Sequence, residues 1–184
     1  MTDIADAAPG GAPGVPRIVV TAAAADLLRR LVVGHGALMM HQSGGCCDGS
    51  APMCYPAGEF VVGDRDVLVG VLDLRLRVGE IPVDLPDGAD AVPVWISGPQ
   101  FEAWQHTQLV IDAVPGRGSG FSLEAPEGVR FLSRGRAFTD EEAALLAADE
   151  PVTGQQWEAG RRPAPVAVPQ IVAEAADACP VPRR

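Results

Sequence analysis

The segment that decides the fold, residues 17–42, reads RIVVTAAAADLLRRLVVGHGALMMHQ. Its first four residues are mostly β-branched and predict a short strand, after which Thr21 can cap a helix over residues 22–33. Leucine and valine at helical spacing give this helix one apolar face, and two glycines end it. Residues 37–42 then predict an apolar strand. The segment therefore predicts a strand, a helix and a strand in close succession.

The residues downstream predict a β-rich middle and a helical end. Strands are predicted at residues 60–62, 67–72, 74–78, 92–96, 107–114, 121–124 and 129–138. A short helix follows Gly98-Pro99, and the capping box Thr139-Asp-Glu-Glu142 predicts another over residues 140–148. Together these elements predict a compact α+β domain in which mixed β-sheets pack with a few short helices.

Composition divides the 184 residues into one domain with two extensions. Residues 1–16 are mostly Ala, Gly and Pro and predict a disordered arm. Residues 17–149 are long enough to bury a single hydrophobic core. Residues 150–184 are rich in Pro and Ala and predict a tail that is partly ordered at most.

Charge and hydropathy exclude several classes of protein. The chain has 14 arginines, no lysine and a formal net charge of −10. Schiff-base catalysis by lysine is therefore excluded, and binding to nucleic acid is disfavoured. The apolar runs fall far short of the ~20 residues that a membrane-spanning helix needs, so we expect no membrane segment and a cytoplasmic location. In a reducing cytoplasm, clustered cysteines favour metal or redox chemistry over disulfides.

The stretch from His41 to Pro56, HQSGGCCDGSAPMCYP, carries three of the four cysteines. Thiolates bind iron, zinc and copper, and the surrounding glycines permit a turn in which Cys46, Cys47 and Cys54 converge. His41 is the candidate fourth ligand. We therefore expect a metal site that takes iron or zinc, with copper as a further candidate and an iron–sulfur cluster also compatible.

Other interpretations of these residues stay open. The cysteines can be small buried hydrophobes, which is how free cysteine commonly packs, or a vicinal pair with lowered thiol pKa that forms a reversible disulfide. His41 alone is typical of a hydrogen-bonded residue at the end of a strand, and His106 of a surface residue.

Two carboxylates, Asp112 and Glu124, interrupt apolar stretches. A carboxylate in such a place is either paired with arginine or recruited to a site. The alternating arginines of residues 130–136 favour pairing. The residues expected to surround the metal ligands are Asp48, Tyr55, His106 and Glu124.

The cysteine stretch, the Ile111-Asp112 strand and the Gly118 to Glu124 turn resemble the bacterial family known as domain of unknown function 779 (DUF779), over roughly residues 17–142. That family has no settled activity. The resemblance implies only a recurring gene neighbourhood with aldehyde and alcohol dehydrogenases, so we expect an accessory role beside such an enzyme.

A more distant similarity is to A-type iron–sulfur carriers of the HesB-like fold. It rests on Thr21 to Ala25, Gly44-Gly45-Cys46, Ile111-Asp112 and Gly120-Phe121. The similarity implies a compact HesB-like α+β domain in which Cys46 matches the carriers' first cluster-ligating cysteine. Their other two ligands form a Cys-Gly-Cys near the C-terminus, whereas residues 131–136 here contain no cysteine. Cys47 and Cys54 are the expected local replacements.

These observations favour a non-catalytic metal- or iron–sulfur-binding accessory protein, expected to be a homodimer that supports an aldehyde or alcohol dehydrogenase. The first alternative is a small metalloenzyme in which Cys46, Cys54 and His41 hold one metal with an open position. The second is a metal-free thiol redox or aldehyde-capturing protein with Cys46 or Cys47 as the nucleophile. The sequence leaves open whether the protein is an enzyme.

Overall fold

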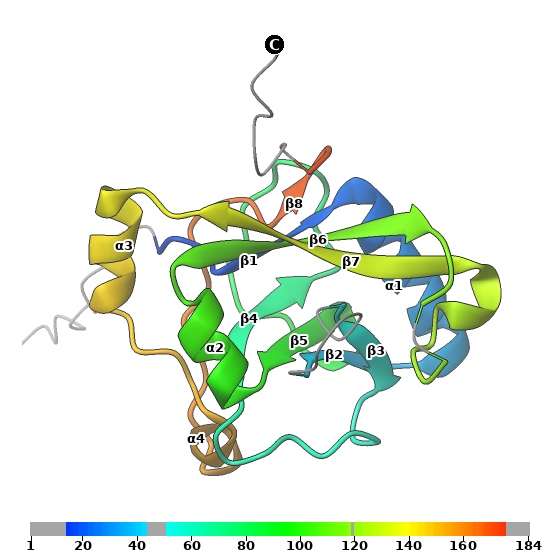
Figure 1. Ribbon diagram of the computed structural model, residues 1–184, viewed down its shortest axis with the longest axis horizontal. Helices are drawn as coiled ribbons and strands as arrows, with labels where there is room; N and C mark the ends of the chain where they lie inside the picture. The colour runs from blue at the N-terminus through cyan, green and yellow to red at the C-terminus, as the bar shows by residue number, and fades with distance from the viewer. Residues whose placement is uncertain (1–13, 44–50, 119, 176–184) are drawn as a thin grey trace, which may run out of the picture.

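The structure is a computed structural model that describes residues 14–43, 51–118 and 120–175. Its elements follow one another as β1 (Ile18–Thr21), α1 (Ala22–His35), β2 (Leu38–Gln42), β3 (Met53–Pro56), β4 (Val67–Asp73), β5 (Ala91–Ile96), α2 (Gly98–Trp104), β6 (Thr107–Pro115), β7 (Val129–Ala137), α3 (Asp140–Ala147), α4 (Gly154–Glu158) and β8 (Ile171–Val172). Single 3₁₀ turns lie at Gly88–Asp90 and Ala125–Glu127. Two mixed sheets combined with these helices (Figure 1) confirm the expected compact α+β domain.

Each sheet mixes parallel and antiparallel pairs. The first sheet has the order β7-β6-β1-β8, in which β1 is parallel to β6 and β8, and β6 is antiparallel to β7. The second has the order β3-β2-β5-β4, in which β2 is parallel to β5 and antiparallel to β3, and β4 is antiparallel to β5. In Figure 1 the first sheet crosses the upper half of the molecule and the second lies below it. The strand that carries Cys54, β3, is therefore an edge strand.

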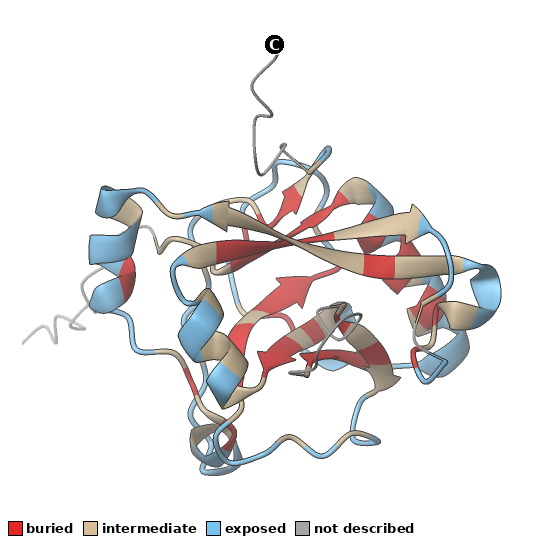
Figure 2. Ribbon diagram, in the orientation of Figure 1, coloured by how far each residue is buried: buried red, intermediate tan, exposed pale blue. Residues whose placement is uncertain are grey.

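The main hydrophobic core joins both sheets to α1. Met40 of the second sheet and Ile111 of the first are fully buried in one cluster, to which α1 adds Leu28. Thr21 caps α1 as predicted, because its hydroxyl accepts a hydrogen bond from the Ala24 N–H. Figure 2 shows the buried residues, in red, concentrated along the strands of both sheets.

A second, smaller apolar cluster covers the opposite face of the second sheet. It contains Met39, Leu68, Val71, Trp95 and Val152, with Tyr55, Phe60 and Trp157 packed against it. The loop after β3 and the region of α4 supply this cover. The rings of Trp95 and Trp157 pack edge to face with their centroids 5.7 Å apart. The second sheet is therefore buried on both faces.

Three predicted strands are wrong, because residues 60–62, 74–78 and 121–124 form turns and loops. Phe60 packs on the second cluster without strand pairing. The carbonyls of Leu74 and Leu76 accept hydrogen bonds from the Arg29 guanidinium, which takes the place of a partner strand. The reverse error occurs at Met53–Pro56, which was expected within a loop and pairs with β2 as β3.

The residues after Glu150 add α4 and β8. Val152 is buried in the second cluster, Thr153 bridges to Val67, and β8 extends the first sheet beside β1. Residues 1–13 of the predicted arm and 176–184 of the predicted tail lie outside the described residues. In the part of the chain that the structure describes, no helix is long and apolar enough to cross a membrane.

Candidate metal centre

Strands β2 and β3 flank residues 44–50, which hold two of the predicted ligands. The strands pair antiparallel, with Met40 opposite Cys54. One residue further along, His41 lies opposite Met53. Directly opposite residues share a face of a sheet and successive residues alternate. Cys54 therefore faces the main core with Met40, whereas His41 faces the second cluster with Met53.

Cys54 is fully buried and is fixed by a turn from a distant part of the chain. Its N–H donates to Ser122 Oγ at 2.8 Å, and its carbonyl accepts from the Leu123 N–H at 3.1 Å. The Ser122 hydroxyl donates in turn to the carboxylate of Glu124. These bonds dock residues 121–124 on the edge strand β3 and hold a carboxyl group close to Cys54.

The Glu124 carboxyl is buried, and among the described residues it forms no ion pair with an arginine or histidine. Burial raises its pKa and Glu127 adds to the rise, although hydrogen bonds from Ser122 and the backbone oppose it. The favoured interpretation, pairing with arginine, is therefore wrong for Glu124 within this part of the chain. Its expected place near the candidate ligands is consistent with its position beside Cys54.

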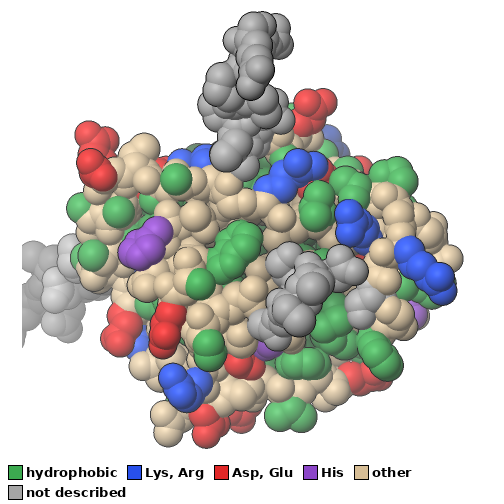
Figure 3. All heavy atoms as spheres, in the orientation of Figure 1, with side chains coloured by type: hydrophobic (Ala, Val, Ile, Leu, Met, Phe, Trp, Pro, Cys, Tyr) green, Lys and Arg blue, Asp and Glu red, His purple; other side chains and the backbone are tan. Residues whose placement is uncertain are grey.

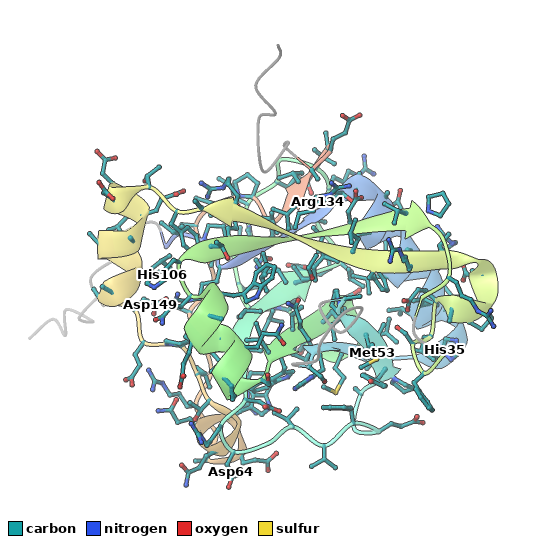
Figure 4. All side chains as sticks on the ribbon, in the orientation of Figure 1. His35, Met53, Asp64, His106, Arg134 and Asp149 are labelled. Carbon is teal, nitrogen blue, oxygen red and sulfur yellow. The ribbon has the colours of Figure 1, made fainter. Side chains whose placement is uncertain are left out.

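Asp112, unlike Glu124, has an arginine partner among the described residues. Arg134 Nη2 lies 3.7 Å from its carboxylate, and the Thr21 hydroxyl donates to it at 2.7 Å. Arg134 lies over β7 in Figure 4, and on the face drawn in Figure 3 several blue arginines lie above the first sheet. Arg136 is likewise paired, with Glu142 at 2.8 Å. Two of the three arginines of β7 therefore pair with acidic residues, and the predicted pairing is confirmed for Asp112.

The thiol of Cys54 is held in its protonated form. Burial raises its pKa to about 12, and the nearby Glu124 carboxyl adds to the effect. A thiol in such surroundings ionises only if a cation compensates for the negative charge. Cys54 by itself is therefore not an activated nucleophile.

His41 is buried among hydrogen-bond partners on the other face of the sheet. Its Nε2 lies 2.9 Å from Asp66 Oδ2, its Nδ1 lies 2.9 Å from Ser43 Oγ, and its ring centroid is 4.4 Å from that of Phe60. Because an ionised carboxylate only accepts, Nε2 donates to Asp66, and Nδ1 is hydrogen-bonded to the Ser43 hydroxyl. Both nitrogens are engaged, so a metal would have to displace one of these partners.

The remaining predicted residues are dispersed. The Tyr55 hydroxyl donates to Met53 Sδ at 3.3 Å, and its ring stacks on Phe60 at 4.8 Å, on the His41 side of the sheet. His106 is exposed and lies across the molecule from Met53 in Figure 4. Cys46, Cys47, Asp48 and Cys179 lie outside the described residues. Within the described ranges, no three His, Cys, Asp or Glu side chains gather closely enough to hold a metal ion, so the three-sulfur set depends on residues 46 and 47.

Three polar residues around these candidates were not predicted from the sequence: Ser122, Asp66 and Ser43. A signal existed for Ser122, because it stands two residues before Glu124 in a glycine-rich turn, where short spacing lets side chains meet. The sequence did not indicate Asp66, because this residue directly precedes β4 and lies 25 positions from His41 in β2.

The family described as "Domain of unknown function (DUF779)" matches residues 27–137, more than half of the chain. The chain belongs to this family. The DUF779 region runs from α1 to the end of β7, and it includes β2, β3 and the turn that carries Glu124. The candidate site therefore lies within the family's own region. No curated protein and no solved structure gave a significant match, so the similarity to HesB-like carriers stays a prediction.

Proposed function

We propose that this DUF779 protein binds a transition metal or an iron–sulfur cluster through the thiolates of Cys46, Cys47 and Cys54, and that it acts as an accessory protein rather than as an enzyme. The observation that carries the proposal is the buried Cys54 beside the buried Glu124, at the end of the segment that holds the other two cysteines.

A thiolate and a carboxylate are unfavourable neighbours in a protein core unless a cation joins them, whereas the protonated groups are neutral. Cys54 is 0 % exposed and Glu124 is 2 % exposed. Buried carboxylates are commonly paired or coordinate a metal, and the described residues give Glu124 no cationic partner. A cation bound at the Cys54 thiolate would compensate for both groups.

The connection between β2 and β3 supplies the other thiols. The chain leaves β2 after Gln42 and enters the neighbouring strand at Met53, so residues 43–52 join adjacent strand ends. Two of the thiols lie in this short connection, and the third, Cys54, follows it in β3. Zinc, iron and copper favour such a set, because these cations prefer soft, charged sulfur ligands. Iron and zinc are the proposed metals, with copper as a further candidate.

His41 is left out of the proposed ligand set. Its side chain lies on the opposite face from Cys54, and Asp66 and Ser43 engage both ring nitrogens. The alternative metalloenzyme needs His41 and Cys54 on one metal, which would require β2 or β3 to rearrange. The accessory role is therefore preferred.

The proposed partner is an aldehyde or alcohol dehydrogenase, and the proposed assembly is a homodimer. The support for the partner is the gene neighbourhood that the DUF779 resemblance implies. Co-purification of the protein with such a dehydrogenase from cells that express both at native levels would support this part, and separate elution would contradict it.

Elemental analysis with an ultraviolet–visible spectrum tests the metal proposal, on protein purified without oxygen, chelator or a metal-affinity tag. We expect metal in a fixed ratio to protein, and sulfide-to-iron absorption bands would identify a cluster. Metal-free protein would contradict the proposal and favour the thiol redox or aldehyde-capturing alternative.

Two matched variants locate the ligands within the chain. Cys46→Ala should lose most of the bound metal, because it removes one of three neighbouring sulfur donors. Cys179→Ala should keep it, because that cysteine stands alone near the C-terminus. Equal metal content in the two variants would overturn the local three-cysteine set.

A further inference from the structure

Three polar side chains form a hydrogen-bonded chain on the second-cluster side of β2: Ser43, His41 and Asp66. The imidazole lies in the middle, with Nδ1 2.9 Å from Ser43 Oγ and Nε2 2.9 Å from Asp66 Oδ2. His41 belongs to β2, Ser43 directly follows that strand, and Asp66 directly precedes β4. A hydroxyl, an imidazole and a carboxylate in this order make up an activated nucleophile, its general base and the group that orients the base.

The imidazole is held in place from several sides. Its ring packs against that of Phe60, with the centroids 4.4 Å apart. The same oxygen of Asp66 that contacts His41 also accepts a hydrogen bond from the Gly63 N–H at 2.8 Å, which fixes the carboxylate. A base supported in this way stays within hydrogen-bond reach of the hydroxyl that it serves.

Exposure increases along the chain toward the hydroxyl. His41 is 3 % exposed, whereas Ser43 is half-buried. A molecule that approaches from solvent therefore meets the Ser43 hydroxyl and not the ring behind it. The reactive end of the chain is the end that solvent reaches.

The carboxylate of Asp66 prepares His41 to take a proton from Ser43. In the neutral ring, the proton that Nε2 donates to Asp66 leaves a lone pair on Nδ1, which lies beside the Ser43 hydroxyl. When Nδ1 takes the hydroxyl proton, the ring becomes a cation next to the carboxylate, which stabilises it. Serine hydrolases use the two ring nitrogens in exchanged roles, and imidazole transfers protons through either one.

Another serine of the same molecule provides a contrast. Ser133 is also half-buried, but its hydroxyl donates to the side-chain oxygen of Gln42 at 2.7 Å. An amide oxygen accepts a hydrogen bond without acting as a base at neutral pH. Ser122, which donates to the carboxylate of Glu124, is buried. These contacts single out Ser43 among the described serines as a half-buried hydroxyl on an imidazole.

We propose that Ser43 is an acylation site, at which its Oγ attacks the carbonyl carbon of an activated ester, with His41 as the general base and Asp66 as the positioning residue. The bond between Oγ and the carbonyl carbon forms, and the bond from that carbon to the leaving oxygen breaks. The Ser43 proton passes to His41 Nδ1 and from there to the leaving oxygen, so the products are acyl-Ser43 and an alcohol.

This site shares no residue with the proposed metal ligands, so acylation and metal binding can succeed or fail separately. Acylation of one hydroxyl per chain is a modification of the protein and is compatible with an accessory role.

The test exposes the full-length protein to p-nitrophenyl acetate. Because thiols react with the same ester, peptide mass spectrometry is used to locate the acetyl group and to follow each site with time. We expect Ser43 to be acetylated, Ser133 to stay free, and acetylation of Ser43 to be lost in urea that unfolds the protein. No acetyl group on Ser43, equal rates at the two serines, or an equal rate at Ser43 in the unfolded chain would overturn the proposal.

Variants assign the roles of the other two residues. His41→Gln should lower the rate of acetylation of Ser43 by about 100-fold or more, because it removes the general base. Asp66→Asn should lower the maximal rate by about tenfold or more, with the half-saturating ester concentration unchanged, because an amide that donates to Nε2 moves the ring proton to Nδ1. Ser133→Ala should change neither quantity.

An unchanged maximal rate in Asp66→Asn, with the native circular dichroism spectrum retained, would contradict the assigned chain of proton transfer. If His41→Gln fails to fold, the comparison of folded with urea-unfolded wild type still decides whether the fold activates Ser43.

Discussion

The two faces of the second sheet differ in how their polar residues are satisfied, although the same two strands supply both. Toward the main core, Cys54 lies with Glu124, and neither has a cationic partner among the described residues. Toward the second cluster, His41 has Asp66 on one ring nitrogen and Ser43 on the other. Among the described residues, Glu124 of the first pair accepts hydrogen bonds from neutral donors, whereas in the second His41 is paired with a carboxylate.

A single step along a strand can divide a predicted ligand set between the two faces of a sheet. Met53, Cys54 and Tyr55 follow one another in β3, so alternation sends the cysteine to one face and its two neighbours to the other. A metal site can therefore recruit Cys54 without disturbing the His41 face.

The largest expected effect is on metal binding by neighbouring residues of β3. Cys54→Ser should lower bound metal to a small fraction of the wild-type value, because it replaces a soft thiolate ligand with a hydroxyl. Met53→Leu, one residue away on the opposite face, should leave it unchanged. Elemental analysis of both variants gives the comparison. Parallel losses in the two variants would mean that the faces are not independent.

The next effect is a loss of stability of the chelator-treated protein in alkali. Burial raises the pKa of Cys54 from 9.0 to about 12, so the folded state holds this proton more tightly than the unfolded state. The associated stability is complete below pH 9 and is lost as pH rises toward 12, by about 4 kcal/mol at ~1.4 kcal/mol per pKa unit.

Urea unfolding of wild type and Cys54→Ala between pH 8 and 10.5 measures this loss. The wild-type free energy of unfolding should fall relative to that of the variant as pH rises. A difference that stays constant across this range would show that the thiol is not buried as described.

A smaller loss of stability is expected from the second apolar cluster, on the face of the sheet that carries His41. Trp157→Ala removes the ring that packs on Trp95 and should lower the free energy of unfolding by about 2 kcal/mol. Val83→Ala, at an exposed position, should have no effect. Equal unfolding midpoints for the two variants would mean that residues beyond Glu150 do not contribute to the folding unit.

The smallest effect is expected at the closed hydrogen-bond pair. Asp66 Oδ2 accepts from His41 Nε2 and from the Gly63 N–H. Asp66→Asn weakens both bonds and should cost about 1–2 kcal/mol in urea unfolding, with bound metal unchanged. A fall in metal content of this variant would bring His41 back into the ligand set.

Much of the fold could be predicted because its local signals are strong. Thr21 and the capping box at Thr139 marked helix starts correctly, and β-branched runs marked β1 and β6. The failures have a common cause, since apolar residues at 60–62 and 74–78 satisfy their packing or backbone bonds through side chains of other elements. Strand β3 was not predicted because its extended conformation is fixed by pairing with β2 rather than by its own composition.

The candidate site could be predicted only in its residue types. Cys54 and Glu124 both stood out in the sequence, but their proximity depends on the docking of Ser122 on Cys54, residues that are 68 positions apart. The faces of Cys54 and His41 depend on β3 being a strand, which the sequence did not indicate. The cysteine motif alone therefore does not predict which residues lie together, because that depends on long-range docking and on strand register.

The most direct test of the central claim is X-ray absorption spectroscopy at the metal edge, on protein purified without oxygen. We predict sulfur neighbours, at about 2.3 Å for zinc, with no imidazole scattering in wild type and an identical spectrum in His41→Gln. A spectrum dominated by nitrogen neighbours with an imidazole signature that disappears in His41→Gln would contradict it.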